Sequence, residues 1–184
     1  MRAITAALVG LAFAAATPAG AQEAPSPYRD QQFTEIRGLT DAELAELRSG
    51  HGMGLARAAE LNGYPGPRHV LDAVTAGQLQ ASPDQIRRIE QIFADMAGTA
   101  RRLGEQIVAE EAALERAFRA GTIDATEVGS RVSRIAVLRG ELRAVHVTAH
   151  VETRAVLSAA QIARYNELRG YGASPGQPQQ HKGH

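Results

Sequence analysis

The chain has 184 residues, in which 20 Lys and Arg side chains balance 20 Asp and Glu side chains, and it contains neither Cys nor Trp. A formal net charge of zero argues against the broad basic surface with which proteins contact nucleic-acid phosphates, so we expect no nucleic-acid partner. Without Cys there is no disulfide, thiolate zinc site or cysteine nucleophile. Hydrophobic residues make up 44% of the chain but aromatic residues only 4%. A core of Ala, Leu, Ile and Val favours packed helices over a β-sandwich.

The first 21 residues have the pattern of a cleaved secretory signal peptide. Arg2 supplies a positive charge before the apolar stretch 3–16, and Ala19-Gly20-Ala21 matches the small-x-small sequence that signal peptidase recognises. A first core helix is the alternative interpretation, but a polar segment follows immediately. The stretch is shorter than the roughly 20 residues that cross a bilayer. We expect an exported protein, without stable membrane insertion because no later segment is apolar enough.

Short elements are predicted in the first part of the exported chain. The segment 22–39 is polar and irregular, and we expect it to be flexible. A short helix over 41–48 is predicted because Thr40 and Glu43 form a capping box at its start. The stretch 50–76 is rich in Gly and Pro in its first part and predicts two further short helices separated by a turn.

Two long helical patterns dominate the rest of the chain. Ser82 caps the first, which runs over about 83–118, and Asp124 caps the second, which runs to about residue 156. Apolar residues recur every three or four positions in both, so each helix carries an apolar seam. The seam residues are Ile86, Ile89, Phe93, Met96, Ala100, Leu103, Ile107, Leu114 and Phe118 in the first helix, and Val128, Val132, Ile135, Leu138, Leu142, Val145, Ala149 and Val156 in the second.

The short break at 120–122 predicts that the two long helices lie antiparallel. We therefore expect an all-α fold, a long antiparallel helical hairpin with short flanking helices, forming one domain over 40–171. The Pro-, Gly- and Gln-rich segment 172–184 is predicted to be a disordered tail. Each seam is too long for one partner helix to cover, so the short helices or a second subunit must cover the remainder, and we expect a homodimer.

No sequence motif indicates an enzyme. The chain lacks Gly-x-Ser-x-Gly, a glycine-rich phosphate loop and His-Glu-x-x-His. The carboxylate pair Glu110-Glu111 lies on a charged helix, where a solvated face is the usual explanation. We expect a protein that is not an enzyme and that uses no organic cofactor.

His146 and His150 are the strongest candidates for a binding site. They lie four residues apart on the second long helix and project to one side, with His146 inside the apolar seam and His150 at its edge. The antiparallel hairpin places them opposite the region of Phe93 and Ala97, with Asp95 nearby. Two imidazoles and a carboxylate suit zinc, nickel, cobalt or copper. The alternative is a pair of hydrogen-bonded interface histidines, because an inward imidazole needs partners.

Four more histidines are weaker candidates. His51 and His69, in the Gly- and Pro-rich stretch, are candidates to complete the ligand set, although each alone is better explained as a turn or helix-surface residue. His181 and His184 in the tail are candidates for a loosely held metal ion. A ligand pair on one helical turn has the advantage that the backbone already sets the separation of its members.

The starts of two predicted helices share a motif. Leu157-Ser158-Ala159-Ala160-Gln161 resembles the Leu-Thr-x-x-Gln motif of the Spy/CpxP-like periplasmic proteins, and Ser82-Pro83-Asp84-Gln85 resembles a first, degenerate copy. The block 50–71 and the ending 165–171 resemble the branch described as periplasmic heavy-metal sensors or heavy-metal resistance proteins. The resemblance covers roughly 40–171.

This resemblance implies a four-helix hooked hairpin, usually dimeric, that acts in the periplasm. It implies a metal-binding protein of the envelope-stress, heavy-metal sensing and resistance type, or alternatively an ATP-independent chaperone that holds unfolded clients on its helical cradle. Partners would then be unfolded envelope proteins or a membrane sensor protein. In the metal-sensing relatives a His-x-x-x-His or His-x-x-x-Met pair on the equivalent helix binds the metal ion, and His146 and His150 match it.

Overall fold

The computed structural model describes residues 26–171; the expected signal peptide and tail, with His181 and His184, lie outside these residues. The chain divides after Gln32 into two compact units, and the larger one begins at Phe33. A 3-10 turn, η1 (Arg29–Phe33), lies at this boundary. The six α-helices are α1 (Asp41–Ser49), α2 (Arg57–Leu61), α3 (Pro67–Thr75), α4 (Pro83–Ala120), α5 (Ala125–Val156) and α6 (Ala159–Leu168).

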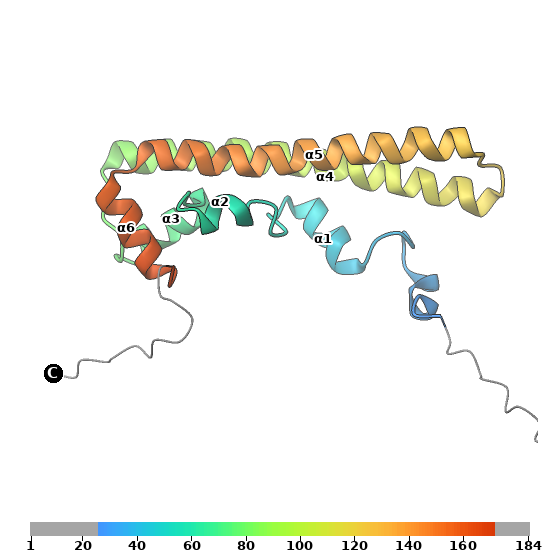
Figure 1. Cartoon of the computed structure of the whole chain (residues 1–184), viewed down its shortest axis with the longest axis horizontal. Coiled ribbons are helices and arrows are strands. Elements are labelled where there is room, and N and C mark those ends of the chain that lie inside the picture. The colour runs from blue at the N-terminus through green and yellow to red at the C-terminus, as the bar shows by residue number, and fades with distance from the viewer. Residues whose placement is uncertain (1–25, 172–184) are drawn as a thin grey trace, which may run out of the picture. The chain divides into compact units, whose positions relative to one another are not determined.

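The two longest helices form the expected antiparallel hairpin, and no strand occurs within residues 26–171 (Figure 1). The predicted all-α class is therefore confirmed. Between the helices, Gly121 takes a left-handed conformation with φ of 66°, which suits a helix C-terminus that must turn at once. The short helices α1, α2 and α3 lie along one side of the hairpin, and α6 turns back from the end of α5 towards α3 (Figure 1).

The helix starts follow from local side-chain chemistry. The hydroxyls of Thr40, Ser82 and Ser158 each accept a hydrogen bond from the backbone N–H three residues later. The side chain at that later position in turn accepts a hydrogen bond from the backbone N–H of the cap residue. Asp124 caps α5 by accepting a hydrogen bond from the Glu127 N–H at 2.8 Å. These side chains satisfy N–H groups that the first turn of a helix leaves without partners.

The two copies of the Ser-x-x-Gln motif also contact each other. The carboxamides of Gln85 and Gln161 exchange two hydrogen bonds, each 3.0 Å long. Gln85 donates a further bond to the Val156 carbonyl at 2.9 Å, and Gln161 donates one to the Gln80 carbonyl at 2.8 Å. The start of α4 is thereby joined to the start of α6.

One apolar cluster lies where α1 crosses the hairpin. Its buried members are Ile36, Leu39, Leu44, Leu47, Ala100, Leu103, Ile107, Val108, Leu138 and Leu142. Ile36 and Leu39 fall within the segment expected to be flexible, yet they are 4% and 5% exposed because they cover the seam beside α1. The backbone of α1 approaches closely at Gly104, where a Cβ atom would lie 1.9 Å from the Leu47 carbonyl oxygen.

A second cluster lies where α3 and α6 meet the base of the hairpin. Its buried members are Val70, Leu79, Ile89, Leu157 and Tyr165. Towards the hairpin turn, in contrast, two predicted seam residues are uncovered, since Phe118 is 56% and Val132 49% exposed. The predicted seam is therefore buried along only part of its length. No helix among the described residues has the length and apolar character needed to cross a membrane.

We predict that Gly104→Ala strongly destabilises the protein. The added methyl group must displace the backbone of α1, and overpacking of this kind costs about 2–3 kcal/mol. Gly98→Ala on the same helix is the matched control, because nothing lies within 4 Å of its Cβ position. It should stabilise the protein by about 0.5–1 kcal/mol through its better helix propensity. Urea unfolding of both variants checks the difference, and equal midpoints would contradict the close contact.

Candidate metal centre

The seam of α5 changes character between the two apolar clusters. After Leu142, which belongs to the first cluster, its buried positions are His146, Ala149 and Thr153, and Leu157 then belongs to the second cluster. The Thr153 hydroxyl is satisfied locally because it donates to the Ala149 carbonyl at 2.7 Å. Among these buried side chains, His146 is therefore the one that needs partners from elsewhere in the fold.

Four histidines line a single pocket of about 500 Å³ beside this stretch of α5. His146 and His150 come from α5, His69 from α3 and His51 from the turn after α1. The facing wall comes from α4 and contains Phe93, Met96 and Ala97, as the predicted hairpin register requires. The structure therefore brings together the four histidines that the sequence singles out within the described residues.

His146 is the most buried of the four, with 4% exposure. Its Nε2 atom is inaccessible and makes no hydrogen bond with any described residue. The turn at Gly52 lies against the other side of the ring, where a Cβ atom would be 3.8 Å from Nδ1. Burial lowers the pKa of His146, and the neighbouring His150 lowers it further. The ring is therefore held in the neutral form that a metal ion requires.

His150 is oriented by a backbone acceptor. Its Nδ1 atom lies 2.7 Å from the Tyr64 carbonyl oxygen, and because a carbonyl only accepts, Nδ1 carries the proton. The Glu60 Oε2 atom lies 3.5 Å from the same nitrogen. In the neutral ring the Nε2 atom then carries the lone pair, and it lies close to Gly66, where a Cβ atom would approach it to 3.1 Å. A hydrogen bond that fixes one ring nitrogen and leaves the other free is typical of metal-ligating histidines.

His69 and His51 complete the pocket from the outer side. His69 is exposed, and its Cδ2 atom would lie 3.6 Å from a Cβ atom on Gly66. Partial burial lowers the pKa of His69, and the nearby Arg169 lowers it further. His51 Nδ1 lies 2.6 Å from the Ser49 hydroxyl, which itself donates to the Glu46 carbonyl, so Nδ1 is the donor and Nε2 is free.

Asp95 lies away from the four histidines. Its side chain is exposed, accepts a hydrogen bond of 2.8 Å from Gln91, and borders a separate hollow with Thr148 and Glu152. The reason is helical phase, because Phe93 and Ala97 face the pocket while Asp95, two residues from each, points to another side of α4. The structure therefore separates Asp95 from the other candidate ligands.

The pocket suits a metal ion without being a finished site. Within residues 26–171, no three His, Asp or Glu side chains stand close enough together to hold a metal ion. The fit rests on the donor set, since a buried imidazole nitrogen without a partner and a second free imidazole nitrogen lie one helical turn apart. A third ligand requires a side-chain rotation, which is open to the exposed His69 and His51.

Comparison with known protein families agrees with this chemistry. The family described as heavy-metal resistance matches residues 51–164, which include the four histidines of the pocket. The chain belongs to the heavy-metal resistance family. No curated protein and no solved structure matches it. The matched range runs from the first pocket histidine into α6, so it covers α2, α3 and both helices of the hairpin, while α1 lies before it.

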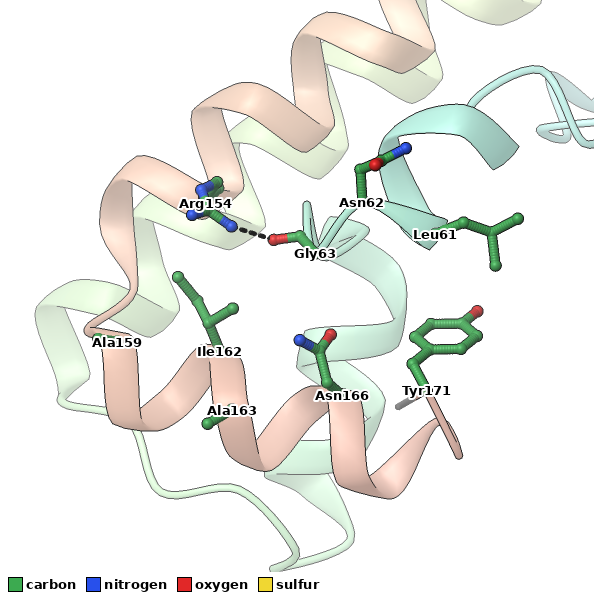
Figure 2. A pocket seen from close by; sticks show the side chains of 9 residues that line it. All are labelled: Leu61, Asn62, Gly63, Arg154, Ala159, Ile162, Ala163, Asn166 and Tyr171. Atoms are coloured by element: carbon green, nitrogen blue, oxygen red, sulfur yellow. Dashed lines mark hydrogen bonds between the residues drawn. The ribbon is translucent and has the colours of Figure 1, made fainter. Parts of the chain in front are cut away.

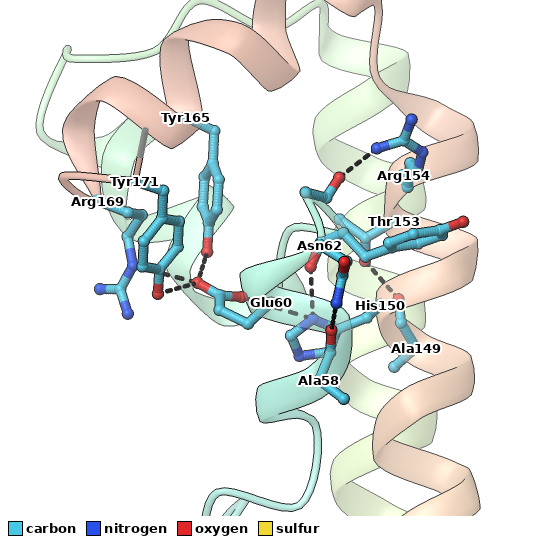
Figure 3. A network of polar contacts seen from close by, with 12 residues as sticks. Ala58, Glu60, Asn62, Ala149, His150, Thr153, Arg154, Tyr165, Arg169 and Tyr171 are labelled. Atoms are coloured by element: carbon cyan, nitrogen blue, oxygen red, sulfur yellow. Dashed lines mark hydrogen bonds and ion pairs between the residues drawn. The ribbon is translucent and has the colours of Figure 1, made fainter. Parts of the chain in front are cut away.

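Sequence reasoning missed Glu60, which is only 9% exposed at the end of α2. Its Oε1 atom accepts hydrogen bonds from the Tyr165 hydroxyl at 2.6 Å, from Arg169 Nε at 3.2 Å and from the Tyr171 hydroxyl at 3.2 Å (Figure 3). The one sequence signal for this residue was the ending Tyr165–Tyr171. It carries three hydrogen-bond donors, Tyr165, Arg169 and Tyr171, with no acidic acceptor on the same face of the helix. The acceptor lies about one hundred residues earlier, so no local pattern links them.

We predict that the metal-free protein loses stability as the pH falls below about 6.5, the ordinary His pKa. The pKa of His146 is lower in the folded than in the unfolded chain, so protons bind the unfolded chain first and favour unfolding. His146→Leu should flatten the pH dependence. Urea unfolding at pH 7.5, 6.5 and 5.5 with a chelator measures it. An unchanged slope in His146→Leu would contradict the prediction.

Proposed function

We propose that this member of the heavy-metal resistance family binds a divalent transition metal ion in the histidine pocket. The observation that carries the proposal is the buried Nε2 atom of His146, without a partner among the described residues, one helical turn from the free Nε2 atom of His150. His69 or His51 supplies a further ligand by rotation. Zinc, nickel, cobalt and copper all accept imidazole ligands.

A metal cation fits this pocket better than an anion does. Arg68 and Arg101 also line the pocket, and protonated histidines beside them would favour an oxyanion. Burial, however, lowers the pKa of His146, so the ring stays neutral and offers a lone pair. Arg68 is already paired with Asp72. The neutral His146 ring can donate its lone pair to a metal cation but not to an anion.

We further propose that binding takes place in the periplasm, where the protein serves heavy-metal sensing and resistance as part of an envelope stress response. Export rests on the signal-peptide pattern in the first 21 residues. The protein acts by binding and not as an enzyme, because the pocket offers ligands without an adjacent nucleophile motif. A membrane sensor protein is the proposed recipient of the signal.

We predict that the His146→Ala/His150→Ala variant loses tight zinc and nickel binding. Removing both ligands of the preorganised pair should weaken the affinity at least tenfold, or about 1.4 kcal/mol. Titration calorimetry of the exported chain measures this, and circular dichroism should show unchanged helix content. Affinity should also fall as the pH drops and imidazoles protonate. Binding by the variant as tight as that of the parent would show that these histidines are structural.

Three control variants separate the pocket from other sources of ligands. Asp95→Asn should bind metal as the parent does, because its side chain lies outside the pocket. His181→Ala/His184→Ala should also bind normally, and loss of binding here would identify the tail as the ligand source. Gly66→Ala keeps every histidine but places a methyl group about 3.1 Å from His150 Nε2, so it should weaken binding by crowding the free nitrogen.

The uncovered end of the hairpin supports the alternative function, a chaperone that holds unfolded envelope proteins. Phe118 and Val132, both seam residues, are about half exposed there, and Val137 and Val151 on α5 are 54% and 50% exposed. Exposed apolar side chains along a hairpin suit either a second copy of the chain or an unfolded client. We therefore propose a homodimer, with client binding as the second candidate function.

An aggregation assay distinguishes these functions. We expect the parent to suppress aggregation of an unfolded test protein if it is a chaperone, with or without zinc. Phe118→Ser/Val132→Ser should abolish suppression, and light scattering should show whether the same change converts a dimer into a monomer. A parent that neither suppresses aggregation nor takes up metal would leave only a structural role in the envelope.

A further inference from the structure

Glu60 links the histidine pocket to the C-terminal segment 159–171, which comprises α6 and the turn after it and is called the hook here. The two oxygens of this buried carboxylate face different parts of the fold (Figure 3). Oε1 receives its three hydrogen bonds from the hook, through Tyr165, Arg169 and Tyr171. Oε2 is buried, accepts no hydrogen bond from a described residue, and lies 3.5 Å from His150 Nδ1.

The backbone around Glu60 is held between α5 and the hook. On the α5 side, Tyr64 accepts the bond from His150, and its ring lies 4.6 Å from the Arg154 guanidinium. Arg154 also donates to the Gly63 carbonyl. The segment 60–64 is therefore bonded to α5 through Gly63 and Tyr64 and to the hook through Glu60.

The hook is not closely packed against α5 at this level. An open groove of about 550 Å³ separates them, lined by Arg154 on one side, by Ile162 and Asn166 of the hook on the other, and by the turn at Gly63 (Figure 2). Apolar burial of the hook is concentrated elsewhere, around Tyr165 in the second cluster. Ile162, Leu168 and Tyr171 also pack against this cluster, so apolar contacts hold the hook on one side while Glu60 supplies its polar contacts towards the pocket.

We propose that Glu60 couples metal occupancy of the histidine pocket to docking of the hook. A cation on His150 Nε2 strengthens the docking of residues 159–171, and a docked hook strengthens cation binding. The proposal rests on the metal-binding function proposed above and assigns a regulated element to that site. Glu60 acts here as a positioning residue, since it acts on the cation through His150.

The direction of the coupling follows from charge. A cation on one nitrogen of an imidazole makes the N–H on the other nitrogen a stronger donor, so it draws the Glu60 carboxylate towards His150 Nδ1. A carboxylate held in place by His150 keeps its Oε1 atom in position to accept the hydrogen bonds from the tyrosine hydroxyls and from Arg169. Coupling free energies are reciprocal, so the hook must favour the cation by the same factor.

Two measurements on the exported chain test the coupling. Hydrogen exchange of the amides of 159–171 should slow by about tenfold when zinc is added, within the usual range of allosteric coupling. In Glu60→Gln, zinc should leave the exchange of the hook unchanged. The variant Tyr165→Phe/Tyr171→Phe keeps both rings and removes two hydrogen-bond donors. Calorimetry should show that it binds zinc about tenfold more weakly than the parent, the same factor by which zinc slows exchange in the parent.

The controls separate failure of the coupling from failure of the site. Glu105→Gln, at an exposed position on α4, should behave as the parent in both measurements. Tyr171→Phe alone removes only the longer tyrosine bond and serves if the double variant is unstable. Zinc binding by the parent with unchanged exchange in 159–171, or slowing that persists in Glu60→Gln, would overturn the coupling alone. Absence of any zinc binding by the parent would overturn both proposals.

Discussion

Two long helices with an aliphatic seam can bury that seam only where another element lies across it. In the larger unit, α1 crosses the hairpin at one level, and α3 with α6 crosses it at another, each with its own apolar cluster. Between these levels α5 presents His146, a ring that an aliphatic core would exclude because its buried nitrogens need partners. The pocket therefore lies between the two apolar clusters, where α4 and α5 form its inner wall and the turn after α1 and the start of α3 form its outer wall.

Near this interval, two buried side-chain atoms have no hydrogen-bond partner among the described residues, the Nε2 atom of His146 and the Oε2 atom of Glu60. Each such atom costs on the order of 1–3 kcal/mol of stability. The Oε2 atom of Glu60 lies 3.5 Å from Nδ1 of His150, which is itself oriented by Tyr64, and His146 lies one helical turn before His150 on α5. Buried polar atoms without partners lower the stability of the empty site. A bound ion that supplied their missing partner would therefore raise the stability of the fold.

The sequence predicts the parts of this arrangement that depend on neighbours in the chain. The helix starts can be predicted because each cap and its partner lie three residues apart in the sequence; the caps are Thr40, Ser82, Asp124 and Ser158. The pairing of His146 with His150 can also be predicted, because the two residues lie only four positions apart on one helix. The position of Asp95 requires the rotational phase of α4 against α5, which small shifts in packing change. Glu60 could not be found, because its partners from Tyr165 onwards lie more than one hundred residues away.

The contact between the two motif glutamines restricts which amino acid can end each motif. An isolated capping box accepts Glu as readily as Gln, because only a side-chain oxygen is needed. Here each carboxamide also donates, to the partner's oxygen and to a backbone carbonyl. A Glu at either position would place two acceptors face to face and leave the carbonyl of Val156 or Gln80 without its donor. Both positions must therefore carry an amide side chain for this contact to form. The residue at position 85 thus restricts which substitutions at position 161 preserve the contact.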